Sequence, residues 1–95
     1  MNKKRNRLEI IKDILQAIKN KNNSAKPTHI LYKSNLSHQM MKEYLEEMIT
    51  GGMIEEKPSP KKSGGRVYSV KDKGEQYLSK YRMISEFTDS FGLNQ

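Results

Sequence analysis

Apolar residues recur at intervals of three and four positions in three stretches of the chain, and this spacing predicts amphipathic helices. The first stretch covers residues 8–20. Its apolar stripe consists of Leu8, Ile11, Ile14, Leu15 and Ile18. The second covers 28–34, directly after Pro27, a residue that suits a first helical turn. The third runs from His38 to Thr50 and ends at a pair of glycines.

The segment between the second and third helices predicts a tight turn. Asn35 can adopt the left-handed conformation that ends a helix. Ser37 can cap the following helix through its side-chain oxygen. Two helices joined by so short a turn are typical of a helix-turn-helix.

The pattern changes after the third helix, where two short segments predict a β-hairpin. Residues 53–57, "MIEEK", form a strand that ends before Pro58, because proline cannot donate to a strand ladder. Residues 66–70, "RVYSV", alternate and form the returning strand, with Tyr68 and Val70 on one face. The tip between them contains two lysines and two glycines, so the hairpin carries a basic loop.

A last helix is expected over residues 72–91, with Asp72 and Glu75 as a capping pair at its start. Along it, apolar and aromatic residues recur at gaps of four and three, which is a coiled-coil spacing. These residues are Tyr77, Tyr81, Ile84, Thr88 and Phe91. The stripe predicts a homodimer that pairs through this helix. The alternative is that it completes the core of a monomer.

The order of these elements predicts the fold class: mainly α with a small β-hairpin (α+β). A hairpin directly after a helix-turn-helix makes a winged helix-turn-helix, here followed by a C-terminal dimerisation helix. We expect a basic flexible arm at 1–7 and a winged helix-turn-helix domain at 8–71. The C-terminal helix then covers 72–91, and residues 92–95 form a tail.

Charge indicates the class of partner. The 95 residues carry a net charge of +7, and residues 1–26 hold eight cations and two acids. Residues 57–73 hold six cations and one acid. Clusters of this kind favour a polyanion, and double-stranded DNA is the expected partner. No apolar run is long enough to span a bilayer, so we expect no membrane partner. We expect a cytoplasmic, nucleoid-associated location.

Helix-turn-helix proteins read base edges with the first turn of the second helix of the motif. In this chain that turn holds Ser37, His38, Gln39 and Lys42. Phosphate contacts need charge and little geometry, and cations near the motif and on the hairpin provide it. These residues are Lys33, Lys61, Lys62 and Arg66. The alternative is that both sets form an ordinary solvated surface.

Two longer segments, "LYKSNLSHQMMKEYLEEMITGGMIEE" and "YSVKDKGEQYLSKY", resemble the archaeal ArnR-like winged helix-turn-helix family. The likeness covers about residues 7–85 and includes Tyr68, Val70, Gly74 and Leu78. Relatives of that family include small basic DNA-binding proteins that dimerise through a C-terminal coiled coil. The resemblance therefore implies a DNA-binding homodimer that acts as a regulator or a chromatin-associated protein. One departure is Lys71, where such sequences often place threonine.

Enzyme chemistry has no support in the sequence. Cysteine is absent, which excludes disulfides and thiolate metal sites, and His29 and His38 have no metal-ligand spacing. We expect no enzymatic activity, no cofactor, no metal and no small-molecule effector. The predicted function is a homodimeric DNA-binding transcriptional regulator. The alternatives are a non-specific chromatin-type protein and a winged-helix module whose third helix binds another protein.

Overall fold

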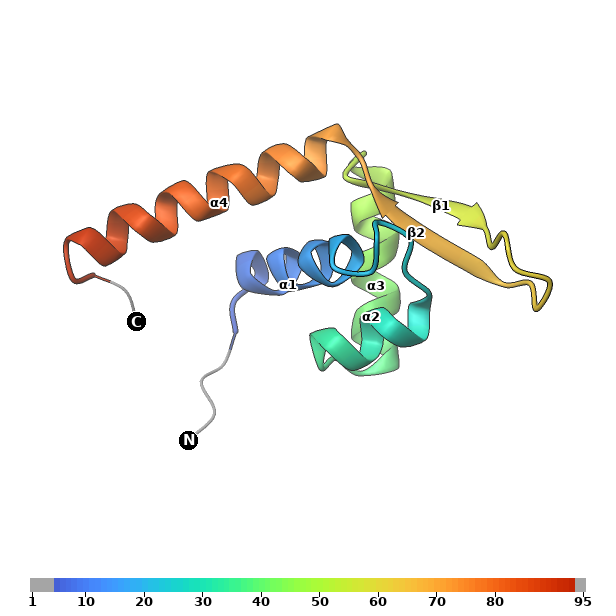
Figure 1. Cartoon of the computed structure of the whole chain (residues 1–95). Coiled ribbons are helices and arrows are strands. Elements are labelled where there is room, and N and C mark those ends of the chain that lie inside the picture. Colours follow the sequence, from blue (N-terminus) through green and yellow to red (C-terminus); the bar gives the residue numbers. More distant parts are fainter. Residues whose placement is uncertain (1–4, 94–95) are drawn as a thin grey trace.

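The computed structural model describes residues 5–93, which form four helices and one antiparallel hairpin (Figure 1). In chain order these are α1 (Arg7–Lys19), α2 (Pro27–Ser34), α3 (His38–Thr50), β1 (Ile54–Pro58), β2 (Arg66–Val70) and α4 (Asp72–Ser90). The hairpin projects from one side of the three-helix body, and α4 runs back along α1 to the opposite side (Figure 1). The fold is therefore mainly helical with a small hairpin, and the predicted winged helix-turn-helix is confirmed.

α1 begins before the predicted residue, and the predicted basic arm at 1–7 is correspondingly too long. Asn6 accepts a hydrogen bond from the backbone N–H of Glu9 at 2.8 Å, and the Glu9 side chain accepts from the Asn6 N–H. This capping box starts the helix at Arg7. Arg5 is also held, because it donates to Asp13 at 2.7 Å and to the Asn35 carbonyl at 3.1 Å. Residues 1–4 lie outside the described part of the chain.

The turn between α2 and α3 has the predicted caps. Asn35 ends α2 with φ 53° and ψ 53°, the left-handed conformation. Ser37 caps α3, and its hydroxyl accepts from the N–H of Met40 at 3.1 Å. These local bonds set the angle at which α3 leaves the body, and hence the direction that its first turn faces.

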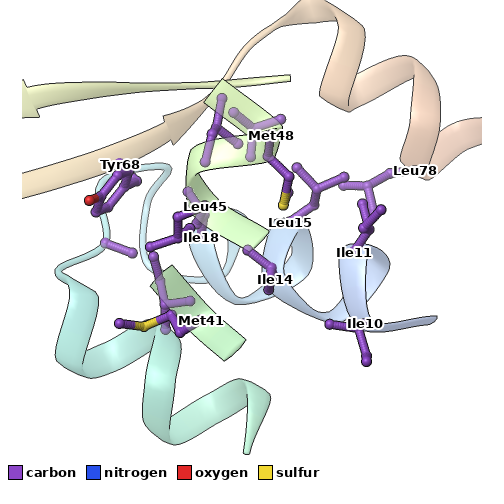
Figure 2. Packing of buried hydrophobic residues seen from close by; sticks show 14 residues of the cluster. Ile10, Ile11, Ile14, Leu15, Ile18, Met41, Leu45, Met48, Tyr68 and Leu78 are labelled. Carbon is purple, nitrogen blue, oxygen red and sulfur yellow. The ribbon is translucent and has the colours of Figure 1, made fainter. Parts of the chain in front are cut away.

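The core lies where α1, α3 and the hairpin meet, and Figure 2 shows its labelled members. Ile14, Leu15 and Ile18 are fully buried, as predicted. Leu8 was expected in the same stripe but is 56% exposed, whereas Ile10 is buried. The reason is that α1 packs against α2 on one side and α4 on the other. Its buried face is therefore wider than one stripe and is rotated away from the side chain of Leu8.

β1 pairs with β2 in the register Ile54↔Val70 and Pro58↔Arg66, so the strand extends one residue beyond its predicted end. The hydrogen-bond pattern of the hairpin allows a proline at this last position of β1. Tyr68 uses its backbone N–H and carbonyl to pair with Ala25 on the other edge, at 2.8 and 3.0 Å. Because Tyr68 directs both backbone groups to Ala25, it forms no hydrogen bonds with Glu56, its partner on β1. Pro58↔Arg66 lies two residues further along and is also a pair without hydrogen bonds between the strands, so the missing N–H of proline costs no bond. The loop after α1 thus covers the outer edge of β2.

α4 starts differently from the prediction. Lys71 is the N-cap and makes no side-chain capping bond, while Asp72 is already helical. The predicted Asp72–Glu75 capping pair is therefore wrong, and the Glu75 carboxylate instead accepts from Lys19 at 2.7 Å. The backbone N–H of Lys71 donates to the Met53 carbonyl at 2.9 Å, which ties the start of α4 to the start of the hairpin. The start of α4 is therefore held by contacts with α1 and the hairpin and not by a side-chain cap of its own.

Candidate nucleic-acid interface

A groove between the start of α3 and the hairpin brings together three of the predicted base-reading residues. His38, Gln39 and Lys42 line it and are exposed. Ser37 is exposed but lies outside this lining, and its hydroxyl is engaged as the cap of α3. The groove thus presents a ring, an amide and an ammonium group on one surface. These are the donor types that contact base edges and phosphates.

The amide of Gln39 is held in position by its own helix. Its Nε2 donates to the Glu43 carboxylate at 2.7 Å, one helical turn further along. One amide hydrogen and the amide oxygen remain for a ligand. That pair of groups is what a glutamine uses to recognise adenine.

Acidic side chains limit how far a duplex can follow the groove. Glu46 of α3 and Glu56 of β1 both line it, opposite and beyond Lys42. These carboxylates repel the phosphates of a duplex, so only the first turns of α3 suit contact with a DNA backbone. The groove is consequently mixed in charge.

The hairpin tip, which we call the wing (residues 59–65), is closed by backbone bonds. Ser59 donates to the Gly65 carbonyl at 2.9 Å, and Gly64 donates to that of Lys61 at 3.0 Å. Both glycines have positive φ, at 77° and 89°, which other residues adopt at a cost. Lys61 and Lys62 are exposed, and within residues 5–93 neither forms an ion pair.

Arg66 differs from the two wing lysines. Its guanidinium pairs with the Glu56 carboxylate at 3.0 Å, and Glu56 also accepts from the Tyr68 hydroxyl at 2.9 Å. Burial, followed by that hydrogen bond, raises the pKa of Tyr68 to about 12. The Tyr68 hydroxyl therefore remains a donor to Glu56. The pairing with Glu56 offsets part of the charge of Arg66, which weakens its case as a phosphate contact.

Lys33 is not brought to the groove between α3 and the hairpin. It lies on α2 and lines a separate hollow with Lys12, Asp13 and His29, between α1 and α2. Sequence spacing placed Lys33 close to the turn of the motif, but its direction from the helix axis carries it to the α1 side.

The predicted seam on α4 divides into two parts. Tyr77 donates to the Leu8 carbonyl at 2.8 Å, and Lys12 lies 5.6 Å from the ring of Tyr81, so both tyrosines contact α1 of the same chain. Ile84 and Phe91 are 64% and 65% exposed. The Thr88 hydroxyl donates to a carbonyl within α4.

A second apolar stripe on α4 was missed by the sequence reading. Met83 and Phe87 are 65% and 60% exposed and lie beside Ile84 and Phe91. The rings of Phe87 and Phe91 are 4.9 Å apart. Positions 83, 87 and 91 differ by four, so this stripe was available in the sequence as helical periodicity. The prediction followed the gaps of four and three through the two tyrosines, which lie on the neighbouring face of α4.

Two other classes of site find no basis in residues 5–93. No group of three or more histidine or acidic side chains is arranged to hold a metal ion. In this part of the chain, none of the helices combines the length and apolar character needed to cross a bilayer.

Comparisons with known proteins agree with this architecture. A family profile described as winged helix-turn-helix matches residues 4–89. The structure resembles that of Sso10a-2, described as a DNA-binding protein from Sulfolobus solfataricus, with a TM-score of 0.73 and 16% sequence identity. The alignment covers 92% of this chain and 85% of that one. At this identity the likeness shows a shared fold. Comparison with curated protein sequences gave no match.

Proposed function

Because the chain belongs to the winged helix-turn-helix family, we propose that it binds double-stranded DNA through α3 and the wing. The observation that carries the proposal is the exposed set His38, Gln39 and Lys42, which lies in one groove beside a basic wing. The structural neighbour Sso10a-2 is described as DNA-binding, which supports the same role here.

The two kinds of contact have separate roles in this proposal. The first turn of α3 enters the major groove, where Gln39 pairs with adenine and Lys42 with guanine. Lys61 and Lys62 neutralise phosphates at the wing tip, which sets register and affinity without reading sequence. Glu46 lines the protein groove, and its carboxylate repels phosphates, so the later turns of α3 stay outside the major groove of the DNA.

The finer role that we propose is transcriptional regulation by a nucleoid-associated protein related to the archaeal ArnR-like family. A donor set that can discriminate bases favours a regulator. The many cations favour a chromatin-type protein that binds without regard to sequence. The ratio between specific and random affinities decides between these two roles.

The direct test is a fluorescence-anisotropy titration with a random duplex and with genomic fragments enriched on the protein, each at ~50 and ~200 mM salt. Fragments that bind ~10³-fold or more tightly than random DNA at the higher salt support the regulator. Equal binding that collapses with salt supports the chromatin-type role. No binding to either duplex contradicts the proposal and favours the module that binds protein through α3.

The α3 contacts predict a loss of sequence preference in one double variant. Gln39→Ala with Lys42→Ala removes the two base-reading donors, and each lost pairing is expected to cost ~1–3 kcal/mol at its base pair. Competition against the enriched fragment and its single-base variants measures the loss. The matched control is Gln76→Ala with Lys80→Ala on α4, which removes the same residue types from exposed positions elsewhere. An unchanged preference in the α3 variant would remove both residues from the reading set.

We further propose that the protein is a homodimer joined through the exposed stripe on α4. The first half of the 19-residue helix contacts α1 at Tyr77 and Tyr81, whereas the side chains of residues 82–87 are exposed. The second half and the C-cap together expose four large apolar side chains: Met83, Ile84, Phe87 and, at the C-cap, Phe91. A helical segment as short as this second half is marginal in water when nothing packs against it, and a contiguous apolar stripe favours a partner. Pairing with the α4 of a second chain would stabilise this half of the helix and bury its apolar stripe.

This proposal predicts that Phe87→Glu produces monomers, because a carboxylate in the centre of the stripe cannot be desolvated without a partner. Light scattering after gel filtration should give about twice 11.1 kDa for the wild type and 11.1 kDa for the variant. Arg82→Glu introduces the same side chain on the polar face of α4 and should remain dimeric. A dimeric Phe87→Glu protein would place the interface elsewhere.

A further inference from the structure

The wing has a second groove on its α2 side, of which the roles above use only Lys61. It lies between the loop after α1, the exposed surface of α2 and the first residues of the wing. Its lining includes Lys21, Lys26, Thr28, His29, Tyr32 and Lys61.

The two grooves differ in charge. The α2-side groove has three lysines and no aspartate or glutamate among its described lining residues. The α3-side groove has one lysine, two glutamates and, beside it, an arginine already paired with Glu56. A phosphate backbone that passes the wing is therefore attracted to the α2 side and repelled from the far end of the α3 side.

Two of the three lysines of this groove lie on the loop after α1, which hydrogen bonds tie to β2. Ala25 pairs with Tyr68 of β2 through two backbone bonds, of 2.8 and 3.0 Å. Asn23 accepts from the Val70 N–H at 2.7 Å and donates to the Val70 carbonyl at 3.4 Å. Lys21 and Lys26 flank these bonds, so their backbone positions are fixed relative to the wing. A ligand then pays only for ordering the side chains.

Tyr32 gives the groove an aromatic wall. Its side chain is 82% exposed, so it contributes little to the core of the folded monomer. Tyrosine combines a large apolar ring with a hydroxyl donor, and such residues are enriched where proteins meet a partner. Beside three lysines, this ring and hydroxyl suit the sugar and phosphate of a nucleic acid backbone.

We propose that the α2-side groove is a second contact surface for the bound duplex. Lys21, Lys26 and Lys61 pair with phosphates, and Tyr32 packs against the backbone. The wing would then be held between base reading by α3 on one side and backbone binding on the other. This inference rests on the proposed DNA binding and names contact residues for it.

The affinity test neutralises the two lysines that lie outside the wing. Lys21→Gln with Lys26→Gln should lower the slope of log affinity against log salt by ~2 for a random duplex. Lys73→Gln with Arg82→Gln, a charge-matched pair on α4, should leave that slope almost unchanged. Circular dichroism melts of both variants establish that they are folded.

A contact test is independent of affinity. The chain has no tryptophan, so Tyr32→Trp places a single reporter in the groove, and Leu8→Trp places one at the start of α1, far from the wing (Figure 1). Both positions are exposed. Saturating duplex should reduce acrylamide quenching of the Trp at position 32 several-fold and leave that at position 8 unchanged.

The outcomes separate this inference from the function it rests on. A wild-type protein that binds no duplex overturns both. A wild type that binds, with a Lys21→Gln/Lys26→Gln variant that matches its control and an unprotected reporter at position 32, overturns the groove alone. Protection at position 32 by single-stranded oligonucleotide and not by duplex also overturns it, because the groove would then serve a different form of nucleic acid.

Discussion

Replacing Gly74 with alanine is expected to lower the free energy of unfolding by about 2 kcal/mol, which combines the usual cost of overpacking with a gain in helix propensity. A Cβ at this position would lie 2.5 Å from the Met53 carbonyl oxygen and 2.7 Å from a methyl of Val70. The carbonyl belongs to the backbone and already accepts the bond from Lys71 that ties α4 to the hairpin. It cannot move aside without loosening that junction.

Thermal unfolding followed by circular dichroism measures this effect, and a loss of this size lowers the midpoint by about 8–16 °C in a domain of this length. Ser79→Ala, at an exposed position of the same helix, is the control and should be neutral or slightly stabilising. An unchanged midpoint for Gly74→Ala would mean that α4 can shift away from the hairpin at no cost.

Reversing the charge of the wing is expected to weaken duplex binding by on the order of 100-fold at ~100 mM salt. Lys61→Glu with Lys62→Glu removes two phosphate contacts and adds two repulsive charges at the tip. The lysines have no ion-pair partner within residues 5–93, so the fold does not depend on their charge. The unfolding midpoint should therefore stay close to that of the wild type.

The control for the wing keeps the charge and changes the side chain. Lys61→Arg with Lys62→Arg should bind random duplex about as well as the wild type, since phosphate contacts depend mainly on charge. Binding that survives the glutamate variant would show that the wing does not touch DNA. The basic surface would then have to be assigned to the loop after α1 and to α2.

Much of the fold could be predicted from the sequence because its signals are local. The left-handed Asn35 and the capping Ser37 act within a few residues of themselves, so their types alone indicated the turn of the motif. The start of α1 lies one residue before the predicted Leu8. Its signal, the capping box of Asn6 with Glu9, is also local.

The candidate site was predictable only in part. The first turn of α3 follows from the helix-turn-helix order, and the structure does place His38, Gln39 and Lys42 together. The pairing of Arg66 with Glu56 depends on the register of the hairpin, which brings residues ten apart into contact. The α2-side groove depends on Ala25 pairing with Tyr68, a contact that no short motif announces.

The order of elements, the caps of the motif and the excess of positive charge can be read from the sequence, because periodicity, capping and composition are properties of neighbouring residues. Which charges are already paired and which face of α4 is exposed depend on how the elements pack together. Tyr77 and Tyr81 lie against α1, while Met83 and Phe87 do not. Both outcomes follow from distances between elements far apart in the chain, and these distances arise when the core packs.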